Sequence, residues 1–164
     1  MYMKKVIIIL ALFIITLFSA VFAETLKAGV SIDSVPKGFF GSWQVDAQLD
    51  KTTNYSTFKP QSRDLWNLSR VGNVISLENP FTKAHATVEL KHTEGNVIVF
   101  SKTSSFDNKI LNDTVTIRLN GDTFGGYNNI ELQTVSLHDG HIMKTDRATY
   151  ILKGKKLAGS SVLK

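Results

Sequence analysis

The sequence predicts an all-β domain, an antiparallel up-and-down meander of about eight to ten strands that closes into a barrel. Three observations predict this fold. Apolar and polar residues alternate along much of the chain after residue 40, short Gly- or Asn-containing turns separate the alternating segments, and no amphipathic helix interrupts them. Closure removes the unpaired edge strands that promote aggregation. A two-sheet β-sandwich is the alternative arrangement of the same strands.

Alternation with a period of two residues is clearest in three segments. Over residues 42–50 every odd-numbered residue, from Trp43 to Leu49, is apolar, and every even-numbered residue is polar. Residues 84–91 and 114–119 repeat the pattern. Successive side chains of a strand point to opposite sides of a sheet, so each segment has one face for a core and one for solvent.

Turn residues divide the chain into hairpins. Asn120-Gly121 supplies the positive φ angles that a tight type I′ turn requires, and Asp139-Gly140 separates two later strands. Gly125-Gly126, inside a strand-like stretch, predicts a bulge or a sharp bend. The connections Asp50–Arg63 and Thr103–Asn112 are longer, and we expect them to form loops around the open end of the barrel.

The N-terminus carries the pattern of a secretory signal peptide. Lys4 and Lys5 precede the apolar run of residues 6–18, and Ala23 ends a segment suited to signal peptidase. We therefore assign residues 1–23 to a cleavable signal peptide, with an uncleaved membrane anchor as the alternative. The apolar run is shorter than the roughly 20 residues that span a bilayer.

The remaining sequence is divided into an extended leader, residues 24–39, and a single barrel domain, residues 40–164. The chain has no cysteine, which excludes lipid attachment at the cleavage site, disulfides and thiol chemistry. The lysines at the start and the lack of cysteine point to a bacterial protein that is periplasmic or secreted. We expect no membrane span after the signal peptide is removed.

Charge and motifs argue against several function classes. The formal charge of +5 includes the two lysines of the signal peptide, so the exported domain is only mildly basic, and a nucleic-acid partner is not expected. The sequence contains no serine-nucleophile, phosphate-binding or dinucleotide-binding motif. We therefore assign no catalytic residue and no cofactor, and we do not expect an enzyme.

The histidines and carboxylates of the sequence are interpreted as solvated polar residues and not as a metal or catalytic site. His138 and His141 flank Asp139 in a predicted turn, which we interpret as a polar turn and not as a metal site, because a metal site needs further converging ligands. Asp64 and Glu89 fall on the polar phase of their strands, which predicts a solvated outer face.

A short motif at the start of the first strand, Gly41-Ser42-Trp43, resembles the Gly-x-Trp signature of lipocalins and related calycin barrels. Thr145-Asp146-Arg147 resembles the Thr-Asp and Arg elements of the same family, although these belong to separate motifs there. The disulfide common in lipocalins and a clear C-terminal helix are missing. The resemblance covers roughly residues 40–162. It implies a cup whose closed end is plugged by Trp43, with Arg147 or Arg118 packed over the ring.

Large aromatic residues near strand centres are the candidates for ligand contact. Trp66, Phe100 and Tyr150 are expected to line a cavity, because the interior of an eight-stranded barrel is just large enough to hold one small ligand. The alternative is that the same rings fill a solid core.

These features predict an exported binding protein that holds a small apolar or amphipathic ligand. The alternative is a secreted protein-interaction module, such as a hydrolase inhibitor or a surface adhesion factor, that acts through its loops. A continuous apolar cavity favours the first function, and a packed core with an exposed apolar loop patch favours the second.

Overall fold

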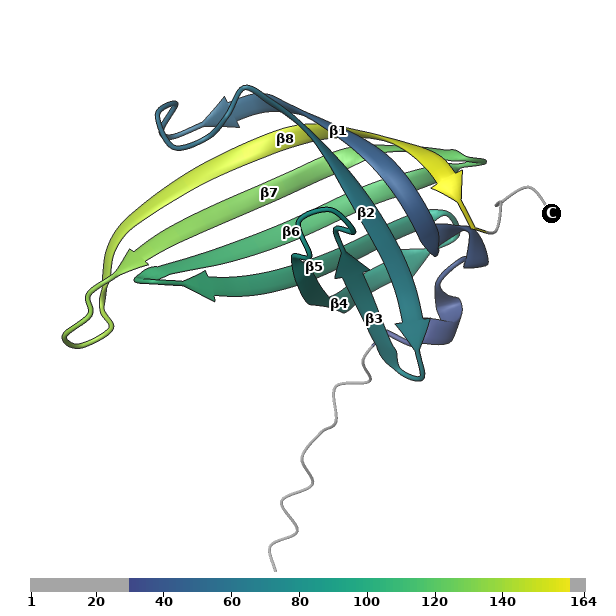
Figure 1. Ribbon diagram of the computed structural model, residues 1–164, viewed down its shortest axis with the longest axis horizontal. Helices are drawn as coiled ribbons and strands as arrows, with labels where there is room; N and C mark the ends of the chain where they lie inside the picture. The colour runs from purple at the N-terminus through teal and green to yellow at the C-terminus, as the bar shows by residue number, and fades with distance from the viewer. Residues whose placement is uncertain (1–29, 160–164) are drawn as a thin grey trace, which may run out of the picture.

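A closed antiparallel barrel forms the described part of the chain, residues 30–159 of the computed structural model (Figure 1). Each strand pairs with the next, and the last strand returns to pair with the first. The predicted all-β meander and its closure are confirmed, and the sandwich alternative is wrong. The predicted signal peptide, residues 1–23, lies outside the described residues. The strands are β1 (Gly41–Thr52), β2 (Gln61–Val71), β3 (Val74–Glu78), β4 (His85–Glu94), β5 (Val97–Phe106), β6 (Lys109–Asn120), β7 (Thr123–Val135) and β8 (Ile142–Ala158).

The hydrophobic core fills the end of the barrel at which β1 begins. On β1, Trp43 and Val45 are buried, and on β6, Val115, Ile117 and Leu119 are buried, as the alternation predicts. A chain without disulfides depends on this burial for its stability. Within residues 30–159, no helix is long and apolar enough to cross a membrane.

The segment Thr103–Asn112 is a hairpin, so its prediction as a loop is wrong. β5 continues to Phe106, β6 starts at Lys109, and Asp107 adopts a positive φ of 52° in the two-residue turn between them. The alternation is missing here because residues 103–106 at the end of β5 are exposed whichever way they point. Without a core to face, neither side of the strand selects apolar residues.

The hairpin of β6 and β7 differs from the prediction at two places. Its turn is Gly121-Asp122, one residue later than predicted, and Gly121 alone has a positive φ, 59°. Gly125-Gly126 forms no bulge, because the two strands pair without interruption along their whole length. Gly126 serves close packing instead, since a Cβ atom there would collide with the carbonyl oxygen of Thr116.

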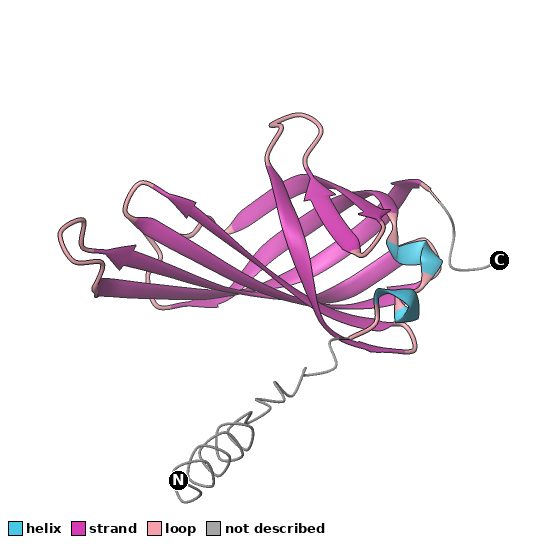
Figure 2. Ribbon diagram, turned by 90° about the horizontal axis from the view of Figure 1, so that it is seen from below, coloured by secondary structure: helices cyan, strands magenta, loops and turns pink. Residues whose placement is uncertain are grey.

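Residues 32–39, part of the predicted extended leader, instead form two short 3-10 turns, η1 (Ile32–Ser34) and η2 (Lys37–Phe39). The turns lie at one end of the barrel (Figure 2). Phe39 is fully buried, and its carbonyl oxygen accepts a hydrogen bond from Trp43 Nε1 at 2.9 Å. The prediction of an extended leader is therefore wrong for these residues, which cover the closed end of the barrel.

The basic side chain over Trp43 is Lys156 from β8. Its Nζ atom lies 4.6 Å from the centre of the ring and donates hydrogen bonds to the carbonyl oxygens of Gly38 and Phe40. Burial lowers the pKa of Lys156, although the charge of Asp122 opposes this effect. The lysine thus joins the 3-10 turns, the tryptophan and the last strand.

The implied placement of Arg147 or Arg118 over the ring is wrong. The buried positions of β8, such as Tyr150 and Leu152, are even-numbered, so the odd-numbered Arg147 points outward. Its Nε atom donates to Glu131 Oε2 at 2.8 Å on the outer surface. The buried positions of β6 are odd-numbered, which places Arg118 outside for the same reason.

Replacing Lys156 by Met is expected to lower the free energy of unfolding by about 2 kcal/mol, because two carbonyl oxygens lose their donor and Trp43 loses a cation–π contact. Urea titration followed by tryptophan fluorescence measures the change. Lys155→Met is the matched control, because Lys155 is exposed on the other face of the same strand. The control should change the free energy by less than about 0.5 kcal/mol. Equal losses in both variants would contradict the role assigned to Lys156.

Candidate functional site

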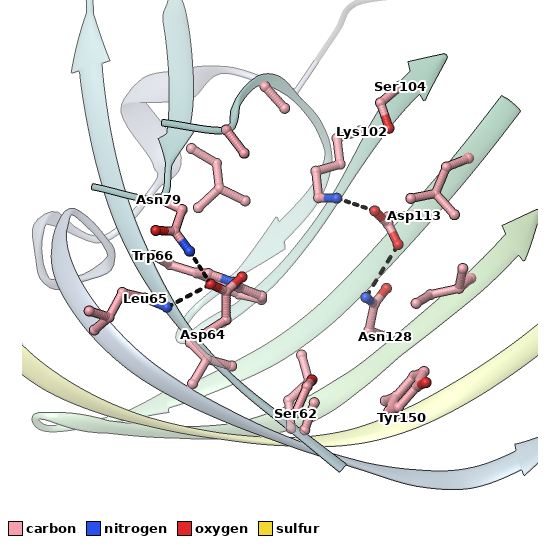
Figure 3. A pocket seen from close by; sticks show the side chains of 18 of the residues that line it. Ser62, Asp64, Leu65, Trp66, Asn79, Lys102, Ser104, Asp113, Asn128 and Tyr150 are labelled. Atoms are coloured by element: carbon pink, nitrogen blue, oxygen red, sulfur yellow. Dashed lines mark hydrogen bonds and ion pairs between the residues drawn. The ribbon is translucent and has the colours of Figure 1, made fainter. Parts of the chain in front are cut away.

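A cavity of about 470 Å³ lies inside the barrel (Figure 3), and Trp43 is not among the residues that line it. Its lining includes the apolar side chains of Val45, Trp66, Leu77 and Leu152. The volume falls within the range of small-molecule sites in proteins, about 300–1,000 Å³. The interior is therefore a packed core at one end and an open space at the other.

The wall around the cavity is uneven in height. β3 has 5 residues and β4 has 10, whereas β7 has 13 and β8 has 17. The long strands consequently project well past the short ones (Figure 1). The connection between β3 and β4 borders the cavity through Asn79 and Ala84, so the low side of the wall forms part of its rim.

Two of the three aromatic residues predicted to contact a ligand line the cavity, and the third packs behind one of them. Trp66 and Tyr150 line the cavity. Phe100 is fully buried, and its ring centre lies 6.3 Å from that of Trp66 in an edge-on arrangement. Phe100 therefore supports the tryptophan from within the core and is not among the lining residues. Trp66 and Tyr150 remain candidates for direct contact with a ligand.

One wall of the cavity carries an ion pair between a partly buried lysine and a buried aspartate. Lys102 on β5 and Asp113 on β6 are directly paired across the two strands, and Lys102 Nζ donates to Asp113 Oδ2. Asp113 is only 3% exposed, and its other oxygen accepts a hydrogen bond from Asn128 Nδ2 at 3.3 Å. The pairing leaves Asn128 Oδ1 buried, with no hydrogen-bond donor among residues 30–159. A buried acceptor in this state costs about 1–3 kcal/mol.

The opposite wall carries a second carboxylate, Asp64 on β2 (Figure 3). Asp64 Oδ1 accepts hydrogen bonds from the backbone N–H of Leu65 at 2.8 Å and from Asn79 Nδ2. The residue is exposed at the mouth, and no basic side chain of the described chain forms an ion pair with it. Of the two carboxylates that line the cavity, Asp113 is neutralised by a lysine and Asp64 is not.

Sequence reasoning missed most of this polar lining. It placed Asp64 on the solvated outer face, which is wrong, and it did not single out Lys102, Asp113 or Asn128. The signal that identifies them is their position along the strand, because residues separated by an even number of positions face the same side of the sheet. Asp64 lies two residues before the buried Trp66, and the other three share the parity of the buried residues on their own strands.

A short loop between β1 and β2, residues 53–60, borders the cavity mouth, and we call it the rim loop. It is shorter than the predicted connection, because both strands extend further than expected. Phe58 on this loop is buried and lines the cavity. The hydroxyl of Tyr150 donates to the carbonyl oxygen of Lys59 at 2.9 Å, which ties the loop to β8. Burial raises the pKa of Tyr150, so the hydroxyl keeps the proton that it donates.

Asp146 on β8 binds two side chains of the rim loop. Its carboxylate accepts hydrogen bonds from Asn54 Nδ2 at 3.3 Å and from Thr57 Oγ1 at 3.2 Å. Lys144 Nζ donates to it at 2.7 Å. The bond from Lys144, followed by those from the loop, holds the pKa of Asp146 below its ordinary value, although burial opposes them.

The histidines do not gather at the cavity. His141 Nδ1 lies 2.6 Å from Asp139 Oδ1 in the exposed turn between β7 and β8. His92 lies beside Glu94, whereas His85 borders the cavity. Within residues 30–159, no three His, Asp or Glu side chains meet in an arrangement that would hold a metal ion.

Comparison with known proteins gives no relative, because no family model, no curated protein and no solved structure matches the chain. The closed meander of eight strands is consistent with a lipocalin-like topology.

Replacing Asp146 by Ala is expected to loosen the rim loop, because Asn54 and Thr57 lose the carboxylate that both bind. We expect faster hydrogen exchange of the amides in residues 53–60, and a lower free energy of unfolding at neutral pH. Asp139→Ala, an exposed aspartate in the β7–β8 turn, is the control and should leave exchange in the loop unchanged.

The effect of Asp146→Ala should depend on pH. Folding lowers the pKa of this carboxyl group, so its contribution is present above the unfolded value of about 3.9 and is lost as pH falls through the folded value. The difference in unfolding free energy between wild type and variant should therefore shrink in acid. A difference that stays constant from neutral pH to below pH ~3 would contradict the assignment.

Proposed function

We propose that this protein is an exported, non-catalytic binding protein that holds one small apolar or amphipathic molecule inside a lipocalin-like barrel. The observation that carries the proposal is the cavity of about 470 Å³, which combines an apolar lining with a few polar groups on its walls. Small-molecule sites in proteins have this size and composition.

Affinity would come mainly from burial of apolar ligand surface against Trp66, Leu77 and Leu152, worth about 25 cal/mol per Å². The polar groups on the walls would set the orientation of the ligand. The rim loop borders the entrance and is attached through individual hydrogen bonds to Tyr150 and Asp146. Opening of this loop is the proposed route of entry.

The state of the polar side chains supports binding over catalysis. Lys102 is bonded to Asp113, Asn79 is bonded to Asp64, and Tyr150 is bonded to the main chain of the rim loop. Side chains held in this way present fixed hydrogen-bonding directions, which suits recognition of a ligand. We propose no cofactor and no nucleic-acid partner.

The proposed place of action is the periplasm or the exterior of a bacterial cell. The support is the pattern of residues 1–23, which combines a basic start, an apolar run and a suitable cleavage position. In such a location, a barrel can carry a poorly soluble molecule through water while it shields the apolar surface of that molecule.

A protein-interaction module is a second candidate function, and one observation favours it. Large apolar side chains are exposed on the connections between strands: Tyr55 and Phe81 are each 77% exposed, and Leu137 is 85% exposed. Apolar side chains exposed on loops offer surface that a protein partner could bury. The partner would be a hydrolase or a surface protein bound by these loops.

Ala86→Phe is expected to fill part of the cavity and to weaken the binding of decanol about tenfold or more, because the new ring occupies ligand space. Isothermal titration calorimetry measures the affinity. Thr87→Phe is the matched control, because Thr87 is the next residue on β4 and is exposed on the outer face. The control should bind decanol like the wild type.

Native mass spectrometry of the protein purified from its source provides an independent test, since a bound small molecule adds mass that denaturation removes. Failure of the wild-type protein to bind decanol, together with the absence of any released molecule, would contradict the first function. Stable capture of one protein partner that Leu137→Ser abolishes would favour the second function.

A further inference from the structure

We propose that the cavity selects an amphiphile whose head is a protonated amine, and that Asp64 binds this head while the apolar lining binds the tail. The inference rests on the proposed function, because it names the class of molecule that the cavity holds. Three features of the lining carry it: a carboxylate without an ion-pair partner, a buried acceptor without a donor, and a lysine, Lys102, that is already bonded to a protein carboxylate.

The carboxylate is that of Asp64. It lies on the inner face of β2, two residues from Trp66, and Asn79 and the backbone of Leu65 direct their N–H groups at its Oδ1 atom. These neutral donors fix the carboxylate but leave its charge uncompensated by any ion pair within residues 30–159. A cation at the mouth of the cavity would gain a charge-assisted hydrogen bond to the remaining oxygen.

The unpaired acceptor is Asn128 Oδ1. The orientation of this amide follows from its neighbour, because the carboxylate of Asp113 accepts hydrogen bonds and therefore requires the Nδ2 end. The oxygen is left as the one buried side-chain polar atom within residues 30–159 that has no partner. Asn128 lines the cavity, on the wall opposite Asp64 (Figure 3). A ligand group that donates hydrogen bonds would satisfy it.

The basic side chains at the cavity do not favour an anionic head. Lys102 Nζ is bonded to Asp113, which is buried and has no other cation, so a ligand carboxylate would compete with an existing ion pair. Lys59 also borders the cavity, but its ammonium group lies on the exposed rim loop, and no hydrogen bond within residues 30–159 fixes its position. Two donors, in contrast, fix the carboxylate of Asp64 on β2, which prepares it for a cation. The lining thus contains hydrogen-bond acceptors that are not fully used, and a protonated amine has the donors that they lack.

Three probes with the same tail test the inference at neutral pH: decylamine, which is a cation, decanol, which is neutral, and decanoate, which is an anion. Calorimetry on the full exported domain is expected to rank decylamine as the tightest. Asp64→Asn, which keeps the shape of the side chain, should weaken decylamine about tenfold and change decanol by less than about twofold.

Asp46→Asn is the matched control for charge. Asp46 lies on β1 beside β2 and is paired with Arg63 on the outer face, so its variant removes the same charge outside the cavity. It should leave the affinity for decylamine unchanged. Circular dichroism and urea titration establish that each variant is folded.

The outcomes separate the inference from the proposed function. Decanoate binding as tightly as decylamine, or equal losses of decylamine affinity in Asp64→Asn and Asp46→Asn, would overturn the inference and leave the proposed function in place. Binding of none of the three probes by the wild-type protein would overturn both.

Discussion

Pairing of the last strand with the first is the constraint on which the rest of the molecule depends. The register runs from Ser42 with Ala158 to Thr52 with Ala148, and it converts an open meander into a wall with an inside. The pairing of β1 with β8 also leaves room for the aromatic side chains that fill the closed end of the barrel. Gly154 lies opposite Val45 in this pairing, and a Cβ atom on Gly154 would collide with the ring of Phe124. That ring in turn packs 5.1 Å from Trp43 between ring centres.

Side-chain size divides the interior into a packed part and an open part. Trp43, Phe39 and Phe100 fill the closed end, where all three are fully buried. Further along the barrel the inward positions include Ala47 and Ala86, which are too small to meet across it. The cavity therefore results from small residues on a wall whose curvature is set by strand pairing, and it needs no separate structural element.

The sequence predicts the fold well because burial imposes alternation wherever one face of a strand meets the core. Alternation does not predict the structure of Thr103–Phe106, where both faces of the strand are exposed to solvent. It also does not predict residues 32–39, because their 3-10 turns have no repeating pattern. For the site, sequence reasoning found the aromatic residues and missed the polar ones, although these share the parity of the buried residues on their strands. A polar side chain such as Asp64 or Asp113 at an inward position looks like a break in the pattern until pairing shows what lies across from it.

The rim loop is attached to the barrel partly through main-chain atoms. Tyr150 binds a carbonyl oxygen, the N–H of Thr53 donates to the carbonyl oxygen of Arg147, and the N–H of Leu49 donates to that of Pro60. Carbonyl oxygens persist whatever side chain the residue carries. Substitutions at Tyr55 or Lys59 can therefore change the chemistry of the cavity entrance while these attachments stay in place.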